Sequence, residues 1–308
     1  METENFSFTS RCDGLEIQCY AWKEVEPLKV KGVVQIAHGM VEHAARYQRF
    51  AKYLNSQGYL VYANDHRGHG KTAGKPEDVG YLGDKDGFER MVQDCHQLTE
   101  MIKKEHPDLP LYFFGHSMGS FITQRYIQEF GKEIKGAILS GSNGSSPIFG
   151  VAKIIAKGEI KKNGPKGKSE KMNKLSFGSY NDNFKPNRTD YDWLSRDNAE
   201  VDKYIADPYC GSVCSSQFYY DFMDGLVTIF KKSNVNNVPK DLPLLIISGS
   251  LDPVGAQGKG VTKLKNMYDK VGIKDVTMKL YPDARHEILN EINRDEVMND
   301  IGNWLKQH

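Results

Sequence analysis

The residues of this chain best suited to chemistry are the five from Gly115 to Gly119, which read Gly-His-Ser-Met-Gly. An apolar run, residues 111–114, precedes them, and a helix-like stretch, residues 121–130, follows. A serine with a glycine two positions away on each side, between a strand and a helix, is typical of a tight turn that exposes a nucleophilic hydroxyl. The alternative is an ordinary turn whose serine caps the next helix. Ser117 is therefore a candidate nucleophile, and partners elsewhere must decide between the two interpretations.

A catalytic serine needs two partners, an imidazole that accepts its proton and a carboxylate that orients the imidazole. In hydrolases with such a turn, the acid follows a late strand and the histidine follows the last one. Asp252 lies just after the apolar run 244–248, and His286 lies just after the run 276–281. This order predicts a triad of Ser117, Asp252 and His286. Three other acids are weaker candidates because they lie so close to the histidine in sequence: Asp283, Glu287 and Glu291.

Acyl transfer from an ester also requires two backbone N–H groups directed at the oxyanion that develops. Met118, directly after the candidate nucleophile and at a helix start, is one expected donor. Met40, in the turn after the strand-like run 33–37, is the other. His38 and His116 are expected to form structural hydrogen bonds rather than to act as general bases.

Composition narrows the function further. The 308 residues include 41 Lys plus Arg and 40 Asp plus Glu, so no global charge attracts nucleic acid. No apolar run approaches the ~20 residues of a membrane span, and the first residues lack the pattern of a signal peptide. Five scattered cysteines fit reduced thiols better than a disulfide framework. A cytoplasmic enzyme is the expectation, and the oligomeric state stays open.

Two segments could suggest a metal. Cys210 and Cys214 are close in sequence, but no histidine or second cysteine pair stands nearby at zinc spacing. The histidines and the aspartate of residues 65–70 are expected to bond to one another and to the backbone, because a serine triad needs no metal. The sequence therefore predicts neither a metal nor a cofactor.

The order of elements predicts an α/β fold with a mostly parallel central sheet flanked by helices. An opening hairpin, residues 6–22, is followed by short apolar strands that alternate with helices. The alternation stops near residue 142 and resumes near residue 242. Residues 1–141 and 242–308 are thus the expected core, and residues 142–241 the expected helical cap, with helices predicted over 147–160, 191–195, 200–205 and 215–231.

The first cap helix carries an apolar group that we predict to bind substrate: Ile148, Phe149, Val151, Ile154 and Ile155. Many lysines stand beside or after it: Lys153, Lys157, Lys161, Lys162, Lys166, Lys168, Lys171 and Lys174. An apolar patch beside positive charge suits peripheral contact with an anionic lipid surface. A solvated lysine face is the equal alternative.

With these residues in place, the chain resembles the monoacylglycerol lipase and lysophospholipase branch of the α/β-hydrolases, also labelled serine aminopeptidase-like. The resemblance spans nearly the whole chain. It rests on His38-Gly39-Met40 with Glu42-His43 and Arg46-Tyr47, on Asp65-His66-Arg67-Gly68-His69-Gly70, on Gly115 to Gly119, on Leu194-Ser195-Arg196-Asp197 with Asp207-Pro208, on Gly249-Ser250-Leu251-Asp252-Pro253-Val254, and on Ala284-Arg285-His286-Glu287. Ser120, where many relatives carry glycine, and the lysine-rich stretch 161–174 depart from the family pattern.

The resemblance implies an esterase that acts on lipids with one acyl chain, with Ser117, Asp252 and His286 as the triad and Met40 and Met118 as oxyanion donors. A small-ester esterase or a serine aminopeptidase of the same fold is the alternative within the enzymes. An alternative from another class is a non-catalytic relative that keeps the fold to bind a ligand.

Overall fold

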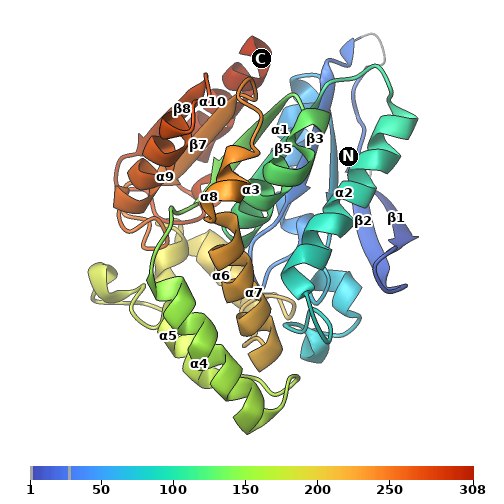
Figure 1. The fold of residues 1–308 in the computed structure, drawn as a ribbon. Coiled ribbons are helices and arrows are strands. Elements are labelled where there is room, and N and C mark those ends of the chain that lie inside the picture. The colour runs from blue at the N-terminus through green and yellow to red at the C-terminus, as the bar shows by residue number, and fades with distance from the viewer. Residues whose placement is uncertain (1–2, 27–28) are drawn as a thin grey trace.

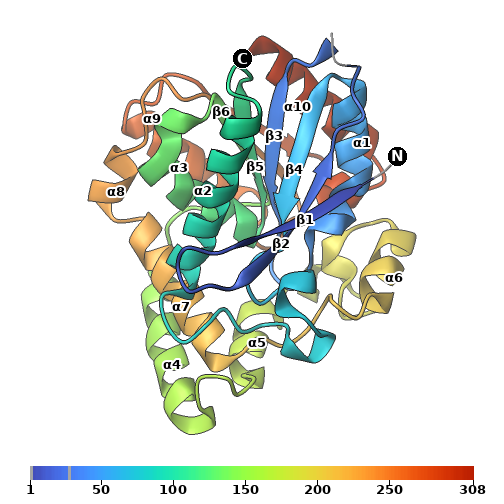
Figure 2. The same cartoon turned by 90° about the vertical axis from the view of Figure 1, so that its right-hand side faces the viewer.

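One eight-stranded sheet forms the centre of the molecule (Figures 1 and 2). The computed structural model describes residues 3–26 and 29–308. The strand order is β1-β2-β4-β3-β5-β6-β7-β8, with parallel pairing from β4 to β8 and an antiparallel β1–β2 hairpin at one edge. The strands are β1 Glu4–Thr9, β2 Glu16–Trp22, β3 Gly32–Ala37, β4 Tyr59–Asn64, β5 Leu111–His116, β6 Gly136–Ser140, β7 Leu244–Gly249 and β8 Val276–Tyr281. The predicted α/β class is confirmed.

Helices cover both faces of the sheet, which explains why its inner strands read as continuous apolar runs. Apolar residues of α1 (Gln48–Ser56) and α10 (Arg294–Gln307) join one buried cluster with side chains from one face. Those of α2 (Gly87–Glu105), α3 (Met118–Phe130) and α9 (Lys259–Lys270) join the cluster on the other face. Every residue of β3, β4, β5, β6 and β7 is buried. The ends of these strands are therefore firmly placed.

Residues 142–241, all of which are described, contribute helices and no strand of the sheet. The helices are α4 Ile148–Asn163, α5 Glu170–Phe177, α6 Asn198–Ala206, α7 Ser216–Ile229 and α8 Lys232–Asn236. Helices α4 to α7 gather at one end of the sheet, where α4 packs along α7, whereas α8 lies beside α3 (Figures 1 and 2). Within the described ranges, no helix is long and apolar enough to cross a membrane.

The sequence interpretation missed α5 and made two other elements of this region too long. Residues 161–174 were interpreted as a lysine-rich stretch, yet Ser169 caps a helix there by accepting the N–H of Met172. The helix expected over 191–195 is a single 3₁₀ turn, Asp192–Leu194. The one expected over 215–231 ends at Ile229, and α8 follows it as a separate helix. Such short elements are set by tertiary contacts more than by local pattern.

Candidate active site

Ser117 stands at the turn between β5 and α3 with φ 53° and ψ −119°. A positive φ is rare for a residue with a side chain and is held only where the surroundings enforce it. Here the Ser117 N–H donates to the Ser140 carbonyl of the neighbouring strand β6 at 2.9 Å. The turn thus has the strained form expected of a nucleophile elbow.

The glycines beside the turn are required by close backbone contacts. A Cβ on Gly115 would lie 2.3 Å from the Gly119 carbonyl oxygen, and a Cβ on Gly119 would lie 2.1 Å from that of Ala37. Both distances are far below van der Waals contact. Ser120, by contrast, fits a side chain, because its Oγ lies 2.6 Å from the Ser117 carbonyl oxygen and 2.8 Å from Ser142 Oγ. Its hydroxyl therefore links the base of the turn to the segment that follows β6.

Asp252 and His286, which are 34 residues apart, meet through a hydrogen bond. His286 Nδ1 lies 2.9 Å from Asp252 Oδ1, and both side chains are buried. Asp252 also accepts the hydroxyl of Ser248 and the N–H of Val254. Burial alone would raise the pKa of Asp252, but His286 and these hydrogen bonds outweigh it and hold that pKa below its usual value. Asp252 is therefore a carboxylate at neutral pH, able to orient the imidazole.

The same pair determines the protonation of His286. Burial alone would lower the pKa of His286, but the Asp252 carboxylate outweighs burial and holds that pKa above the usual value. Asp283, the rival acid, is exposed, and its N–H donates to Ser250 Oγ. The acid that reaches the imidazole is thus Asp252, which is 34 residues away in the sequence, and not its neighbour Asp283.

The loop that carries His286 is held by the region 142–241. The N–H of His286 donates to the Trp193 carbonyl at 3.3 Å, and the N–H of Glu287 donates to the Leu194 carbonyl at 2.7 Å. The Trp193 ring lies 5.1 Å from the His286 ring, centroid to centroid. The backbone at the start of the motif Leu194-Ser195-Arg196-Asp197 therefore holds the loop that carries His286 in place.

A buried charge cluster, formed by Glu42, Arg46 and Glu287, links that loop to the turn after β3. Glu42 Oε1 accepts the N–H of Gly39 at 2.5 Å, and Glu42 Oε2 lies 2.6 Å from Arg46 Nη1. Arg46 also binds both carboxylate oxygens of Glu287, at 2.7 and 2.8 Å. Burial would raise the pKa of each carboxyl, but Arg46 outweighs it and holds both pKa values below their usual range.

This cluster supports the turn that faces the candidate nucleophile. A Cβ on Gly39 would lie 3.3 Å from the Cβ of Ser117, so the Gly39–Met40 turn packs directly against the elbow. Sequence reasoning assigned no role to Glu42 and Arg46 and treated Glu287 only as a rival acid. Glu42 and Arg46 are four residues apart, a spacing that allows an ion pair, but nothing local reveals the third member.

Replacing Arg46 with methionine should destabilise the protein strongly, because two buried carboxylates lose their shared counter-charge. We expect a loss of about 3–5 kcal/mol in the free energy of unfolding. Urea unfolding followed by circular dichroism measures it. Arg49→Met is the matched control, since Arg49 pairs with Glu200 but is 38% exposed, and it should cost below about 1 kcal/mol. Equal losses in the two variants would contradict a buried charge cluster.

Two cavities meet at Ser117. One, of about 270 Å³, is walled mainly by apolar side chains of α4, α5 and α7, among them Phe149, Ile155, Met172, Phe222, Met223 and Leu226. The other, of about 470 Å³, is walled by polar and aromatic groups, among them Asn173, Asn181, Asp182, Asp190, Tyr191, Trp193 and Ser212, and it reaches His286. Met40, Ser117 and Phe177 line both cavities. The candidate nucleophile thus stands between an apolar cavity and one with a mixed polar and aromatic lining, which is called the polar cavity below.

Four of the five predicted substrate-binding residues line the apolar cavity: Ile148, Phe149, Val151 and Ile155. Ile154, the fifth, is 74% exposed and is not part of that lining, so its role in substrate binding stays a prediction. Ile154 follows Val151 by three positions on α4. Because α5 and α7 form the rest of the cavity wall, only one side of α4 faces the cavity. The contributions of α5 and α7 were missed.

The histidine-rich loop of residues 65–70 ties buried segments together. Asp65 accepts the N–H groups of Ala44 and Lys71 and the hydroxyl of Tyr20. Arg67 is buried against Asp94 at 2.9 Å. His38, expected to be structural, accepts the N–H of His66 through its Nε2 at 2.9 Å. His116, the other histidine so described, lies 3.2 Å from Ser140 Oγ through its Nδ1.

The sheet order, the flanking helices and the elbow define an α/β-hydrolase. Within that class, the chain belongs to the hydrolase family described as serine aminopeptidase, S33, whose family model matches residues 28–293. The predicted resemblance is confirmed at the level of this family.

The most informative relatives are lipases and esterases. Monoacylglycerol lipase of Mycolicibacterium smegmatis is 31% identical over 287 residues, covering 90% of this chain and 89% of the relative. Monoglyceride lipase of Mus musculus is 28% identical over 295 residues, covering 95% and 88%. A carboxyl esterase of Bacillus coagulans, solved in complex with glycerol, superposes with a TM-score of 0.92 at 31% identity, covering 100% of this chain and 99% of that one. The protein is thus a hydrolase of a lipase and esterase family.

Proposed function

We propose that this protein is a serine carboxylic-ester hydrolase that cleaves lipids with a single acyl chain, monoacylglycerols or lysophospholipids. The observation that carries the proposal is the position of Ser117 between an apolar cavity and a polar one. An ester of a fatty acid with a polar alcohol has the same two parts, joined at the carbonyl that a nucleophile must reach. The acyl chain occupies the apolar cavity, and the alcohol occupies the polar one.

In the proposed reaction, His286 accepts the proton of the Ser117 hydroxyl as Ser117 Oγ attacks the ester carbonyl. Asp252 orients the imidazole through Nδ1 and stabilises its protonated form. The protonated His286 then gives its proton to the departing alcohol, leaving an acyl-enzyme. Water, deprotonated by His286, attacks the acyl carbon, releases the fatty acid and restores Ser117.

The N–H groups of Met40 and Met118 are the proposed oxyanion donors. Within residues 3–26 and 29–308, neither N–H has an acceptor in the protein. Met118 is the first residue of α3, where the helix dipole adds positive potential. The Gly39–Met40 turn lies against Ser117 and is held by Glu42. These features support two donors directed at the same oxygen.

The names of the relatives support a lipid ester over the alternatives. The curated relatives include monoacylglycerol and monoglyceride lipases, and a monoglyceride lipase of Saccharomyces cerevisiae, solved with a substrate analogue, superposes at a TM-score of 0.77 and 25% identity. A serine aminopeptidase remains the second candidate, favoured by the carboxylates Asp182 and Asp190 in the polar cavity. The non-catalytic alternative is disfavoured because no member of the proposed triad is missing.

Hydrolysis of a substrate panel tests the proposal. We expect monoacylglycerols and lysophospholipids of medium and long chain to be cleaved with higher kcat/KM than short aryl esters and aminoacyl amides. Within the panel, one series of substrates differs only in acyl-chain length and another only in head group. The first series therefore examines the apolar cavity, and the second examines the polar cavity. A clear preference for aminoacyl amides over every acyl ester would overturn the proposed substrate.

Replacing Ala152 with tryptophan should shorten the acyl chain that the enzyme accepts. Ala152 lines the apolar cavity, and the larger side chain takes up space that the chain needs. We expect the ratio of kcat/KM for a long-chain ester to that for an acetate ester to fall at least about tenfold. Ala199→Trp, at an exposed position of α6, is the control and should leave the ratio unchanged. A parallel fall in both variants would argue against the apolar cavity as the acyl site.

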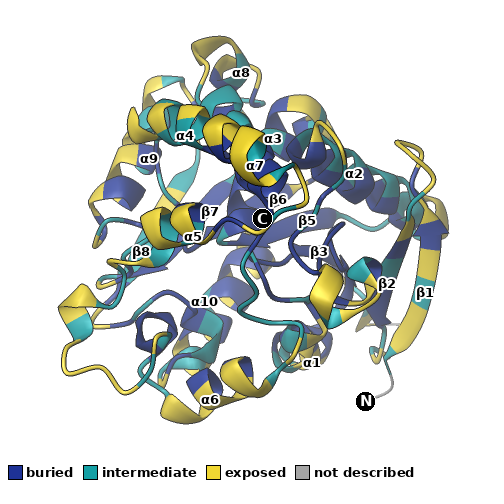
Figure 3. Cartoon of the chain, turned by 90° about the horizontal axis from the view of Figure 1, so that it is seen from below, coloured by how far each residue is buried: buried dark blue, intermediate teal, exposed yellow. Residues whose placement is uncertain are grey.

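The cap, residues 142–241 in the proposed division, provides both the acyl cavity and the proposed contact with a lipid surface. Figure 3 shows the exposed positions on α4 and α5. Large apolar side chains are exposed there: Ile148 at 63%, Val151 at 57%, Ile154 at 74% and Leu175 at 58%. Lys157, Lys161 and Lys174, on the same two helices, are exposed as well. We infer peripheral binding to anionic membranes from the cytoplasmic side, where the five free cysteines also fit.

A further inference from the structure

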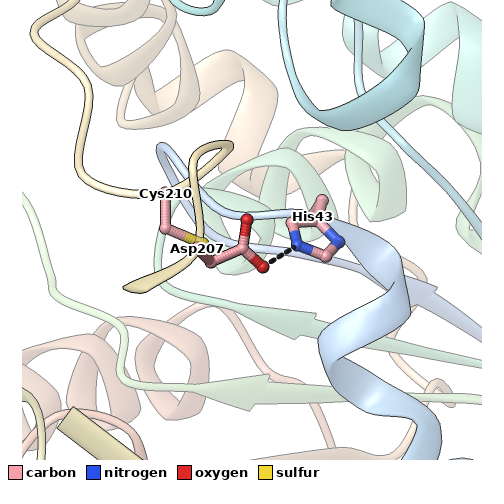
Figure 4. Close-up of side chains that lie close together, drawn as sticks. All are labelled: His43, Asp207 and Cys210. Carbon is pink, nitrogen blue, oxygen red and sulfur yellow. Dashed lines mark hydrogen bonds and ion pairs between the residues drawn. The ribbon is translucent and has the colours of Figure 1, made fainter. Parts of the chain in front are cut away.

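Three potential metal ligands meet outside the proposed triad. His43 follows the turn after β3, whereas Asp207 and Cys210 belong to the loop after α6 (Figure 4). Their ligand atoms all lie within 4.8 Å of one another, and His43 Nε2 is 2.8 Å from Asp207 Oδ2. A nitrogen, a carboxylate oxygen and a sulfur thus converge from two segments that are more than 160 residues apart.

The charges around this group favour a cation. Glu42 and Glu287 share a single guanidinium, that of Arg46. Asp207 bonds to His43, and its ligand oxygen lies within 4.8 Å of the Cys210 sulfur. Three carboxylates therefore stand against one guanidinium, and the charge of Asp207 faces His43 and Cys210.

We propose that His43, Asp207 and Cys210 form a binding site for a divalent transition-metal ion of the zinc class. Zn²⁺ accepts imidazole, carboxylate and thiolate ligands at about 2.0–2.3 Å, so the donor atoms of a tetrahedral site stand roughly 3.3–3.6 Å apart. The His43–Asp207 contact must widen slightly and the sulfur must approach, which are side-chain movements. Three protein ligands leave a fourth position for water.

Binding requires the neutral imidazole and the thiolate. The metal replaces the hydrogen bond between His43 and Asp207, the imidazole keeps its one proton on Nδ1 so that Nε2 is free to bind, and the Cys210 thiol proton passes to solvent. The thiolate makes the site selective for softer ions over Mg²⁺ or Ca²⁺. Because neither Cys12 nor Cys214 belongs to the group, the sulfur that binds is identified in advance.

The bound metal clamps the region 142–241 to the core beside the oxyanion turn. The loop and α6 already contact the segment that carries His43, since the N–H of Gly211 in the loop and the hydroxyl of Tyr204 in α6 both donate to the Val41 carbonyl, at 3.0 and 3.2 Å. Val41 lies next to Met40, the proposed oxyanion donor. A metal at His43 therefore restrains the movement of the cap loop relative to the turn that the reaction uses.

Titration with Co²⁺ tests the site in reduced, full-length protein purified without a histidine tag. We expect one equivalent of Co²⁺ to produce the near-ultraviolet charge-transfer absorption of a cobalt–thiolate bond, and Zn²⁺ to displace it. Cys210→Ser should abolish the absorption. Asp207→Asn and His43→Gln should weaken Co²⁺ binding at least about tenfold. Cys12→Ser, which removes an exposed thiol, and Cys214→Ser, which removes a buried one, should leave the titration unchanged.

A second readout does not depend on cobalt spectra or on hydrolysis. Zn²⁺ should raise the Tm of the wild-type protein and of Cys12→Ser, but not that of Cys210→Ser, because a ligand that binds the folded state stabilises it. Circular dichroism establishes that each variant is folded before the titration. A wild-type protein without the thiolate absorption, or an absorption that survives in Cys210→Ser or disappears in Cys12→Ser, overturns the proposal.

Discussion

Replacing Ser117 with alanine is expected to lower kcat for a medium-chain monoacylglycerol by about 10⁵–10⁶-fold, because no other hydroxyl can take its place at the elbow. The fold should be preserved, since serine and alanine have the same Cβ and meet the same backbone strain at φ 53°. Fatty-acid release measures the rate, and labelling by a fluorophosphonate probe, which requires an activated serine, should disappear with it.

Ser120→Ala is the matched control for that experiment. Ser120 lies one helical turn further on, and its hydroxyl bonds to the Ser117 carbonyl and to Ser142 rather than facing either cavity. The Ser120→Ala variant should still be labelled by the probe. Its rate of fatty-acid release should be far closer to that of the wild type than the rate of Ser117→Ala. If Ser117→Ala kept the wild-type rate, Ser117 would not be the nucleophile.

Replacing Asp252 with asparagine is expected to lower kcat by about 10⁴-fold. The amide keeps the size of the side chain but removes the charge that orients His286 and stabilises its protonated form. Asp283→Asn is the control, because Asp283 is exposed and does not contact the imidazole, and it should retain the wild-type rate. A large loss in Asp283→Asn with little in Asp252→Asn would reverse the assignment of the acid.

The pH dependence of the same pair has a definite sign. His286 must be neutral to accept the serine proton, and Asp252 holds its pKa above the usual value of 6.5. The rate of the wild-type enzyme should therefore fall as the pH decreases through a value above 6.5. In Asp252→Asn the carboxylate is gone, so the pKa of His286 drops and the residual activity should persist to lower pH. If the rate of Asp252→Asn began to fall at a higher pH than that of the wild type, the result would contradict this account.

Local pattern was enough to predict the core of the fold. The strands β3 to β7 are short, mainly apolar runs between helical segments, and burial on both faces of a parallel sheet produces that pattern. The positions of Ser117, Asp252 and His286 follow from strand ends, which are also local. The glycines at 115 and 119 mark the elbow because a side chain there would collide with backbone.

The region 142–241 was predicted less well, because its helices are short and are stabilised by their packing on one another. Helix α5 has few apolar positions among its lysines, so its sequence resembles a solvated segment, yet Met172 is fully buried. Ile154 was assigned to substrate because it is apolar and close in sequence to the cavity residues. Its direction depends on how α4 lies against α7, which no local pattern encodes.

Periodicity and motifs within a few residues were enough to predict the α/β class, the family and the order of the proposed catalytic residues. The side chains that meet across long separations are seen only in the folded chain. Asp252 reaches the Nδ1 of His286, Glu42 and Arg46 join Glu287, and His43 meets Asp207 and Cys210. No local pattern encodes these contacts, because they depend on how strand ends and loops pack in space. Three potential metal ligands can therefore be far apart in the sequence and still meet in the folded chain.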